Sequence, residues 1–175
     1  MPAFFAWSSS FDGDLAVTLS IRPMSASDRP AVLALLLELT AHEATLSAER
    51  ATGPAAAAAC LTDDAEKADE HGGAQIVVQQ GDEVVGYLAL RLGRIGPFVH
   101  EHLRDHVYIE NIVVAAACRG TGIGQLLLAE AERFAREAGC KVLHLSVMEG
   151  NDMALTAYRR AGFGSFALEM AKVLD

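Results

Sequence analysis

Residues 112–124 read IVVAAACRGTGIG, a β-branched run followed by an arginine and three alternating glycines. This pattern predicts a strand, a turn and the start of a helix. Gly120, Gly122 and Gly124 let a ligand approach the backbone closely, and a helix start leaves several N–H groups unpaired. The positive end of the helix dipole and the charge of Arg119 would both attract an anion. The stretch therefore predicts an anion site suited to a pyrophosphate.

The spacing of the glycines excludes two common phosphate-binding motifs. A P-loop needs a lysine within the turn, and this turn contains none. The dinucleotide fingerprint needs a third glycine where this chain has Gln125 or Leu127, depending on the starting glycine. A glycine-rich connection that only tightens strand–helix packing is the remaining alternative to an anion site.

Hydrophobic patterning on both sides of this turn predicts one domain. The expected fold class is α/β (mixed α+β), a central twisted mixed sheet of about six strands flanked by about four helices. The predicted strands cover residues 17–22, 76–79, 84–90, 107–114, 142–147 and 166–173; the predicted helices cover about 28–42, 54–71, 123–138 and 152–160. Residues 1–14 are expected to be an N-terminal extension, and residues 15–175 the domain.

Composition and charge exclude several functional classes. With 14 Lys and Arg against 23 Asp and Glu, the chain has a formal net charge of −9, which disfavours a nucleic-acid binder and favours cationic small molecules. Its longest apolar runs are far below the ~20 residues of a membrane span. Three cysteines without a Cys-x-x-Cys pair suit a reducing cytoplasm and suggest no zinc site. We expect a cytoplasmic protein with no nucleic-acid or membrane partner.

Two linked motifs carry a family resemblance. Arg119-x-x-Gly122-x-Gly124 resembles the pyrophosphate-binding motif of the GNAT acetyltransferase superfamily, although Ala116 stands where the lead-in usually has proline. Residues 151–163 resemble the family's second motif, Asn…Ala…Tyr-x-x-x-Gly-Phe. The resemblance implies a GNAT-like fold and acetyl-CoA as co-substrate. It assigns the following residues to the coenzyme: Ile112, Val113, Val114, Arg119, Gly120, Thr121, Gly122, Ile123, Gly124, Asn151 and Tyr158.

Within the superfamily, the residues around Glu110 and Tyr158 are most similar to those of the diamine and polyamine N-acetyltransferases. Asn111 departs from that pattern, because those enzymes carry a second acid there. The resemblance implies transfer of acetyl to a small primary amine by direct attack in a ternary complex. Acetylation of a protein or peptide amine and a non-catalytic acyl-CoA-binding regulatory module are the alternatives. A homodimer is also expected, since a second copy would complete the sheet edge.

Glu110 is the candidate base. An alkyl ammonium group must lose its proton before it attacks a thioester. Glu110 is a charged residue in an otherwise apolar predicted strand, where an unpaired carboxylate is costly. Regular alternation places it on the same face as residues 108, 112 and 114. The alternative is a structural salt bridge with Arg91 or Arg94.

Tyr158 and Asn151 take their expected roles from the resemblance. Tyr158 would protonate the thiolate of the coenzyme, and its alternative is a packing tyrosine with its hydroxyl at the surface. Asn151 would bind the pantetheine arm. As an asparagine before a predicted helix it is also a candidate N-cap, and the two roles are compatible.

Two polar clusters have simpler interpretations. His100, His102 and His106 lie near two acids in the predicted loop before residues 107–114, without a known ligand spacing. A solvated loop over the acceptor site is favoured over a metal site, and no metal is expected. The acidic run in residues 63–70 is expected to be a solvated helix face.

Overall fold

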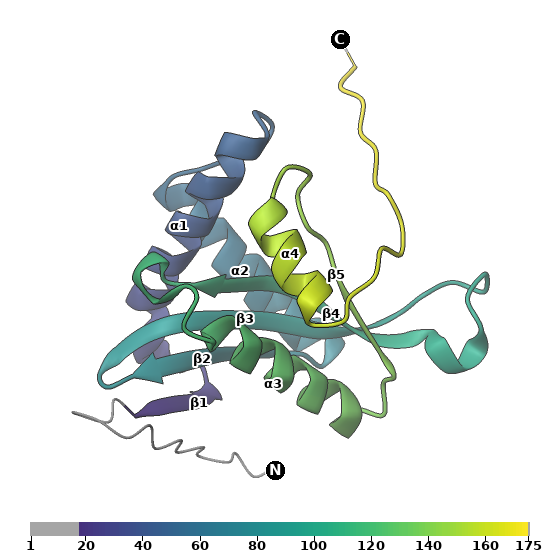
Figure 1. Ribbon diagram of the computed structural model, residues 1–175, viewed down its shortest axis with the longest axis horizontal. Helices are drawn as coiled ribbons and strands as arrows, with labels where there is room; N and C mark the ends of the chain where they lie inside the picture. The colour runs from purple at the N-terminus through teal and green to yellow at the C-terminus, as the bar shows by residue number, and fades with distance from the viewer. Residues whose placement is uncertain (1–17, 175) are drawn as a thin grey trace.

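A computed structural model describes residues 18–174, which form a five-stranded sheet with helices on both faces (Figure 1). Across the sheet the strands are, in order, β1 (Leu19–Pro23), β2 (Ala74–Gln80), β3 (Glu83–Arg94), β4 (Asp105–Val114) and β5 (Val142–Leu145). The helices are α1 (Arg29–Leu46), α2 (Pro54–His71), α3 (Ile123–Glu137) and α4 (Asp152–Arg160). Neighbouring strands are antiparallel, except that β4 and β5 are parallel. The mixed α/β fold class is confirmed.

Each face of the sheet has its own hydrophobic core. Tyr87 of β3 packs with Leu36 of α1 and Leu61 of α2 on one face. Leu88, the next residue of β3, packs with Leu127 of α3 on the other face. Successive strand residues point to opposite faces, so a continuous apolar run in β3 is buried on both sides. The sheet is therefore the middle of three layers.

The helix ends follow the predicted signals. α2 begins at Pro54, and Gly72, in the left-handed conformation, follows its last residue His71. α1 continues to Leu46, one turn beyond the predicted end. None of the helices among the described residues has the length and apolar character that a membrane crossing requires.

The predicted loop at residues 92–106 is mostly strand. β3 and β4 pair as far as Arg94 and Asp105, whose side chains form an ion pair. Only residues 95–104 connect the two strands. At this end of the hairpin, polar side chains pair with each other across the two strands. The sequence therefore lacks the apolar alternation from which strands are predicted.

The predicted last strand, residues 166–173, is absent. After α4, residues 163–174 adopt neither helix nor strand, so the described sheet has five strands rather than about six. Alternating apolar residues indicate a strand-like side-chain pattern, but a strand also needs a neighbour for its backbone groups. Val17 of the predicted first strand and the extension at residues 1–14 lie outside the described residues.

Candidate active site

β4 contains a β-bulge at Glu110. In the pairing with β3, Ile109 lies opposite Leu90 and Asn111 lies opposite Ala89. Leu90 and Ala89 are consecutive, so Glu110 is an extra residue with no partner on β3. A bulge of this kind bends the strand and disrupts the regular alternation of its side chains.

The bulge changes which side chains share a face. Ile109 and Ile112 both pack with the core under α3. Glu110 and Asn111 both hydrogen-bond to side chains of α2, on the other face. The predicted shared face for Glu110 and residue 112 is therefore wrong, because that prediction assumed unbroken alternation.

β4 and β5 separate at the same point. β5 pairs with residues 106–109 of β4, and the last pair is Ile109 with Leu145. Within the described part of the chain, residues 111–114 of β4 pair with β3 and with no other strand, and the bulge residue Glu110 pairs with neither neighbour. Their remaining backbone groups form a strand edge to which an extended chain with amide groups can add. The resemblance assigns the pantetheine arm to this edge.

The glycine turn after β4 leads into the N-terminus of α3. Gly120 and Gly122 have φ angles of 78° and 94°, a left-handed conformation that strains other residues. A Cβ added at either would meet no described atom within 4 Å, so the backbone conformation, not the space, requires glycine. Gly122, the N-cap residue of α3, has no side chain with which to cap the helix. The first-turn N–H groups, from Ile123 onward, are therefore placed to bind an anion.

Side chains hold this turn in position. Nε of Arg119 donates to the Val114 carbonyl at 3.1 Å, and the Thr121 hydroxyl donates to the Cys118 carbonyl at 2.7 Å. Glu38 of α1 accepts from the Ala116 N–H at 3.1 Å, and its carboxylate lies 3.7 Å from Nη2 of Arg119. No pattern in the sequence links Glu38 to a turn that lies 78 residues later.

Asn151 is the N-cap of α4. Its Oδ1 accepts from the Ala154 N–H at 3.1 Å, which confirms the capping interpretation. The cap uses the amide oxygen, and the second role expected of this residue would use the amide NH₂ instead.

Tyr158 is a partly buried tyrosine on α4. Its ring packs against the α3-side core, 5.9 Å from the ring of Phe163. Burial raises the pKa of its hydroxyl, and the charge of Glu43 raises it further. The hydroxyl therefore carries its proton at neutral pH, as an unperturbed phenol also does, and the raised pKa makes it a weaker acid.

Glu110 lies between two cations. Its Oε2 accepts from Nζ of Lys67 at 2.8 Å, and its Oε1 accepts from Nε of Arg91 at 2.6 Å. Of the two predicted partners, Arg91 forms the bridge, whereas Arg94 pairs with acids of its own hairpin. Each carboxylate oxygen thus holds one ion pair and keeps a lone pair for a further donor.

A second carboxylate, Asp64 of α2, is buried behind the bulge at 1% exposure. It accepts from Nδ2 of Asn111 at 2.8 Å and from the Tyr87 hydroxyl at 2.9 Å. Burial raises its pKa to about 6, although both hydrogen bonds oppose the shift.

The prediction of a solvated acidic face is wrong for Asp64. It lies three residues after the buried Leu61, on the same stripe of α2, and that spacing was a usable signal.

The three histidines near β4 do not converge. His100 and His102 stack on each other with ring centroids 5.9 Å apart, whereas the buried His106 contacts the ring of His144 at 4.8 Å. Across residues 18–174, no three His, Cys, Asp or Glu side chains are grouped so as to hold a metal ion.

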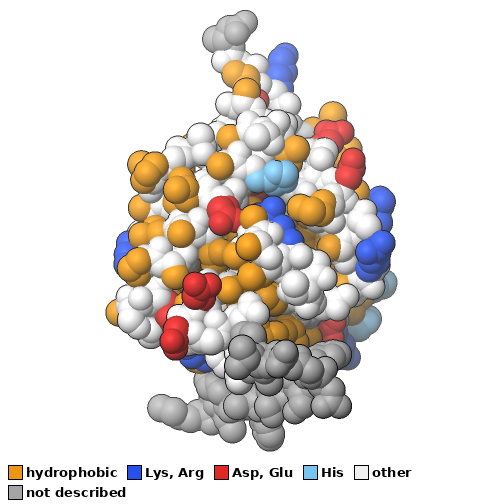
Figure 2. Space-filling model, turned by 60° about the vertical axis from the view of Figure 1, so that its left-hand side comes forward, with side chains coloured by type: hydrophobic (Ala, Val, Ile, Leu, Met, Phe, Trp, Pro, Cys, Tyr) orange, Lys and Arg blue, Asp and Glu red, His pale blue; other side chains and the backbone are white. Residues whose placement is uncertain are grey.

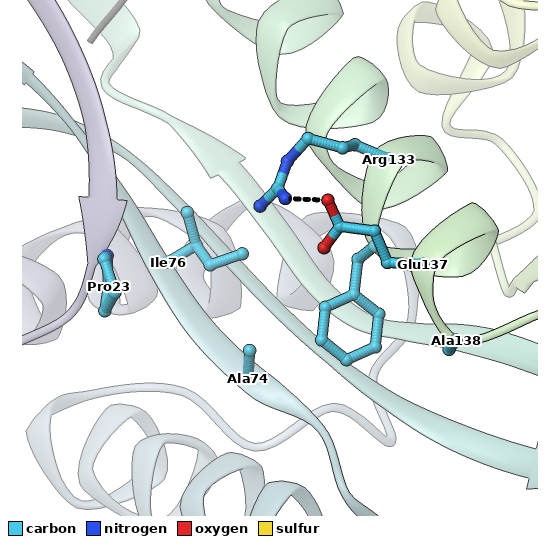
Figure 3. Close-up of a pocket in the computed structure, with 7 residues that line it drawn as sticks. Pro23, Ala74, Ile76, Arg133, Glu137 and Ala138 are labelled. Atoms are coloured by element: carbon cyan, nitrogen blue, oxygen red, sulfur yellow. Dashed lines mark hydrogen bonds and ion pairs between the residues drawn. The ribbon is translucent and has the colours of Figure 1, made fainter. Parts of the chain in front are cut away.

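A hollow of about 340 Å³ lies elsewhere, between α3 and the β1–β2 side of the sheet (Figure 3). Pro23, Ala74 and Ile76 form one wall, and the ion-paired Arg133 and Glu137 lie opposite. Arg133 is ten residues along α3 from its first residue, so the hollow is roughly 15 Å from the glycine turn. It is separate from the candidate active site.

Comparison with known proteins places the chain in a family. The family model described as the acetyltransferase (GNAT) family matches residues 38–163, from within α1 to just beyond α4. The match therefore includes the bulge, the glycine turn, α3 and α4.

Individual relatives match over shorter lengths. Streptothricin acetyltransferase of Streptomyces lavendulae is 48% identical over 63 residues, 36% of this chain and 33% of the relative. N-alpha-acetyltransferase RimI of Mycobacterium tuberculosis is 41% identical over 86 residues, 49% of this chain and 48% of the relative. The chain thus spans about half or less of these two relatives.

Solved structures share the fold over most of the chain. The aminoglycoside N-acetyltransferase AAC(6')-Iy in complex with CoA has a TM-score of 0.68 at 16% identity, covering 93% of this chain and 98% of the other. This likeness shows the fold, and the family model that matches residues 38–163 shows the family. The chain belongs to the acetyltransferase (GNAT) family.

Proposed function

We propose that the protein transfers the acetyl group of acetyl-CoA to a primary amine of a small acceptor. One observation carries the proposal: the open edge of β4 at residues 110–114 runs directly into a glycine turn and an uncapped start of α3. A strand edge followed by an anion site fits a ligand with an amide-containing arm and a pyrophosphate.

The proposed reaction is direct attack on the thioester. The amine nitrogen forms a bond to the acetyl carbon, the carbon–sulfur bond breaks, and the thiolate leaves. Tyr158 supplies a proton to the thiolate sulfur, and the second proton that the nitrogen loses as the amide forms restores the phenol. Glu110 receives the ammonium proton, directly or through a water, as the incoming cation displaces Lys67 or Arg91 from its carboxylate.

For the acceptor, we propose a diamine, a polyamine or a similar cation. The net charge of −9 and the exposed Asp63 of α2, which shares Lys67 with Glu110, support a cationic substrate. A protein or peptide amine is the second candidate, favoured by the similarity to an N-alpha-acetyltransferase. The names of the relatives cover different acceptors, so the acceptor class requires a direct assay.

A thiol-release assay tests the proposal. Purified protein and acetyl-CoA are incubated with polyamines, amino acids, aminoglycosides and basic peptides, and free CoA is measured. We expect release that depends on the amine and is greatest with one cationic class. Coenzyme binding by calorimetry without release for any amine would favour a regulatory module. Absence of coenzyme binding would overturn the proposal.

Two further properties are proposals on narrower grounds. A cytoplasmic location is supported by the free thiols of Cys60, Cys118 and Cys140. A homodimer is supported by the exposed C-terminal part of the chain. Fractionation of cells that express the natural gene tests the location.

A further inference from the structure

Glu38 of α1 contacts the glycine turn that follows β4. α1 lies on the left-hand side of Figure 1, and Figure 2 brings that side of the molecule forward. Charged side chains of both signs are scattered over this face and do not gather into one large patch. Salt screens exposed charges that lie farther away, so the field at the turn depends mainly on the charges that contact it. Glu38 is one of them.

The hydrophobic core fixes α1 relative to the turn. Leu35 of α1 and Val113 of β4 belong to the same buried cluster, and Ala115, just before the turn, packs against it. Glu38 follows Leu35 by three residues, so the two side chains are neighbours on the surface of the helix. A helix anchored in the core therefore carries the Glu38 carboxylate to the turn.

The first effect of Glu38 is on the backbone. Residues 116–118 form one turn of 3-10 helix, and the N–H of its first residue, Ala116, has no partner within a helix of that length. Oε2 of Glu38 accepts from this N–H at 3.1 Å. The related lead-in sequence usually has proline at this position, which has no N–H and a fixed φ. In this chain, Glu38 supplies the constraint that a proline ring would give.

The second effect of Glu38 is on charge. The same Oε2 lies 3.7 Å from Nη2 of Arg119, and the two side chains are 44% and 37% exposed. Arg119 and the first N–H groups of α3 are the groups proposed to bind the pyrophosphate. A carboxylate at this place attracts Arg119 and repels an incoming phosphate. The charge of Glu38 therefore opposes the binding of an anion.

We propose that Glu38 is a positioning residue with two opposing effects on the affinity for the coenzyme. Its hydrogen bond orders the turn and favours binding, whereas its charge competes with the pyrophosphate for Arg119 and weakens binding. The inference rests on the proposed binding of acetyl-CoA at this turn. Acetyl-CoA and CoA carry the same pyrophosphate, so the charge weakens the hold on product as much as on substrate and favours product release.

Two substitutions of Glu38 separate the two effects. Glu38→Gln keeps an oxygen that can accept from Ala116 but removes the charge. The Kd for acetyl-CoA, measured by calorimetry, is expected to fall by about twofold to fivefold, the effect of one exposed ion pair. The Kd for CoA should fall by the same factor, and both differences should vanish in about 1 M salt. Glu38→Ala removes the hydrogen bond as well, so it should bind acetyl-CoA more weakly than Glu38→Gln.

Proline at position 116 tests the hydrogen bond independently. Ala115 has a ψ of 135°, which suits the residue before a proline, and the first residue of a helix has the φ that proline prefers. Glu38→Ala leaves room for the ring by removing the carboxylate from the Ala116 nitrogen. Adding Ala116→Pro to the Glu38→Ala chain is therefore expected to restore the Kd to that of Glu38→Gln.

Glu132→Gln is the matched control. Glu132 is also 44% exposed and pairs with an arginine, Arg136, but it lies nine residues along α3 from Ile123, roughly 14 Å away. Its Kd is expected to equal that of the wild type. Circular dichroism of each variant checks that the fold is retained.

Three outcomes would overturn the inference and leave the proposed function intact. They are equal Kd values for the wild type and Glu38→Gln, an equal fall in Glu132→Gln, and a fall that does not vary with salt. Failure of all these proteins, the wild type included, to bind acetyl-CoA would contradict the proposed function and the inference together.

Discussion

Glu110 and Asn111 are consecutive residues of β4, yet both side chains bind α2. Glu110 accepts from Lys67, and Asn111 donates to Asp64, one turn earlier on the helix. A regular strand would send the two side chains to opposite faces, so the bulge makes the double contact possible. α2 therefore holds β4 at the residue where β4 and β5 separate.

Neutralising Glu110 should slow catalysis more than it weakens coenzyme binding. We expect Glu110→Gln to lower kcat by about 10²–10⁴, the usual contribution of a general base. The amide keeps the size of the side chain but removes most of its basicity. Steady-state rates of CoA release, with coenzyme affinity from calorimetry, separate the two effects.

Arginine variants provide a matched control for that result. Arg91 binds Glu110, whereas Arg94 binds Asp105 and Glu101. Arg91→Gln should therefore change the pH dependence of the rate, and Arg94→Gln should leave it as in the wild type. Equal rates for wild type and Glu110→Gln would show that the carboxylate has only the structural role.

Asp64 should make the protein less stable as the pH rises. Its folded-state pKa is about 6, above the value of 3.8 for an unperturbed carboxyl. The folded state therefore binds a proton more tightly than the unfolded chain, and this stabilisation is lost as the pH rises through 6. Two pKa units correspond to about 3 kcal/mol. Asp64→Asn, neutral at every pH, should be more stable than the wild type at pH 8 by up to that amount, and this advantage should vanish near pH 4.

Urea unfolding between pH 4 and 8 measures this difference. The amide introduced by Asp64→Asn can still accept from Asn111 and donate to the Tyr87 hydroxyl, so the network keeps its hydrogen bonds after the Gln75 amide turns. Asp69→Asn, at an exposed position of the same helix, is the control and should follow the wild type at each pH. A free-energy difference between wild type and Asp64→Asn that does not vary with pH would contradict the prediction.

The local signals in the sequence predicted the helices and the turn well. Pro54 marks the start of α2, Gly72 follows its end, and Asn151 caps α4. These residues were predictable because each acts through its backbone conformation or through a hydrogen bond within its own turn. The glycine turn belongs to the same class, since two of its residues require positive φ angles. Each of these features depends on a few neighbouring residues, so it can be predicted from the sequence without knowing which distant segment packs against it.

Features that depend on distant contacts were not predictable. The bulge at Glu110 is visible only in the register against β3, and Glu38 reaches the turn from a separate helix. The segment after α4 has the side-chain pattern of a strand, but the pattern does not say which edge pairs with it. The sequence identified the candidate residues, and the fold determines which face and which partner each one has.

The conformation of Gly122 should control coenzyme affinity. Alanine at a φ of 94° is strained, so Gly122→Ala should shift the turn and raise the Kd for acetyl-CoA. Gly139, beyond the other end of α3, has a φ of 74° and equally open surroundings. Gly139→Ala therefore carries similar strain away from the site. Calorimetric titration should show weaker binding for Gly122→Ala alone, and equal weakening in both variants would indicate a general loss of stability.

Removal of the Tyr158 hydroxyl should slow departure of the thiolate. We expect Tyr158→Phe to lower kcat by about 10²–10⁴ with little change in the KM for acetyl-CoA, because the lost proton transfer occurs only in the transition state. In the wild type, burial raises the pKa of the Tyr158 hydroxyl. The hydroxyl should therefore stay protonated throughout an assay from pH 6 to 9, and its titration should cause no decline in rate there. Tyr108→Phe is the control, since that hydroxyl is already hydrogen-bonded to Ser146 at 2.6 Å. Steady-state kinetics that give both variants the same kcat would exclude Tyr158 as the proton donor.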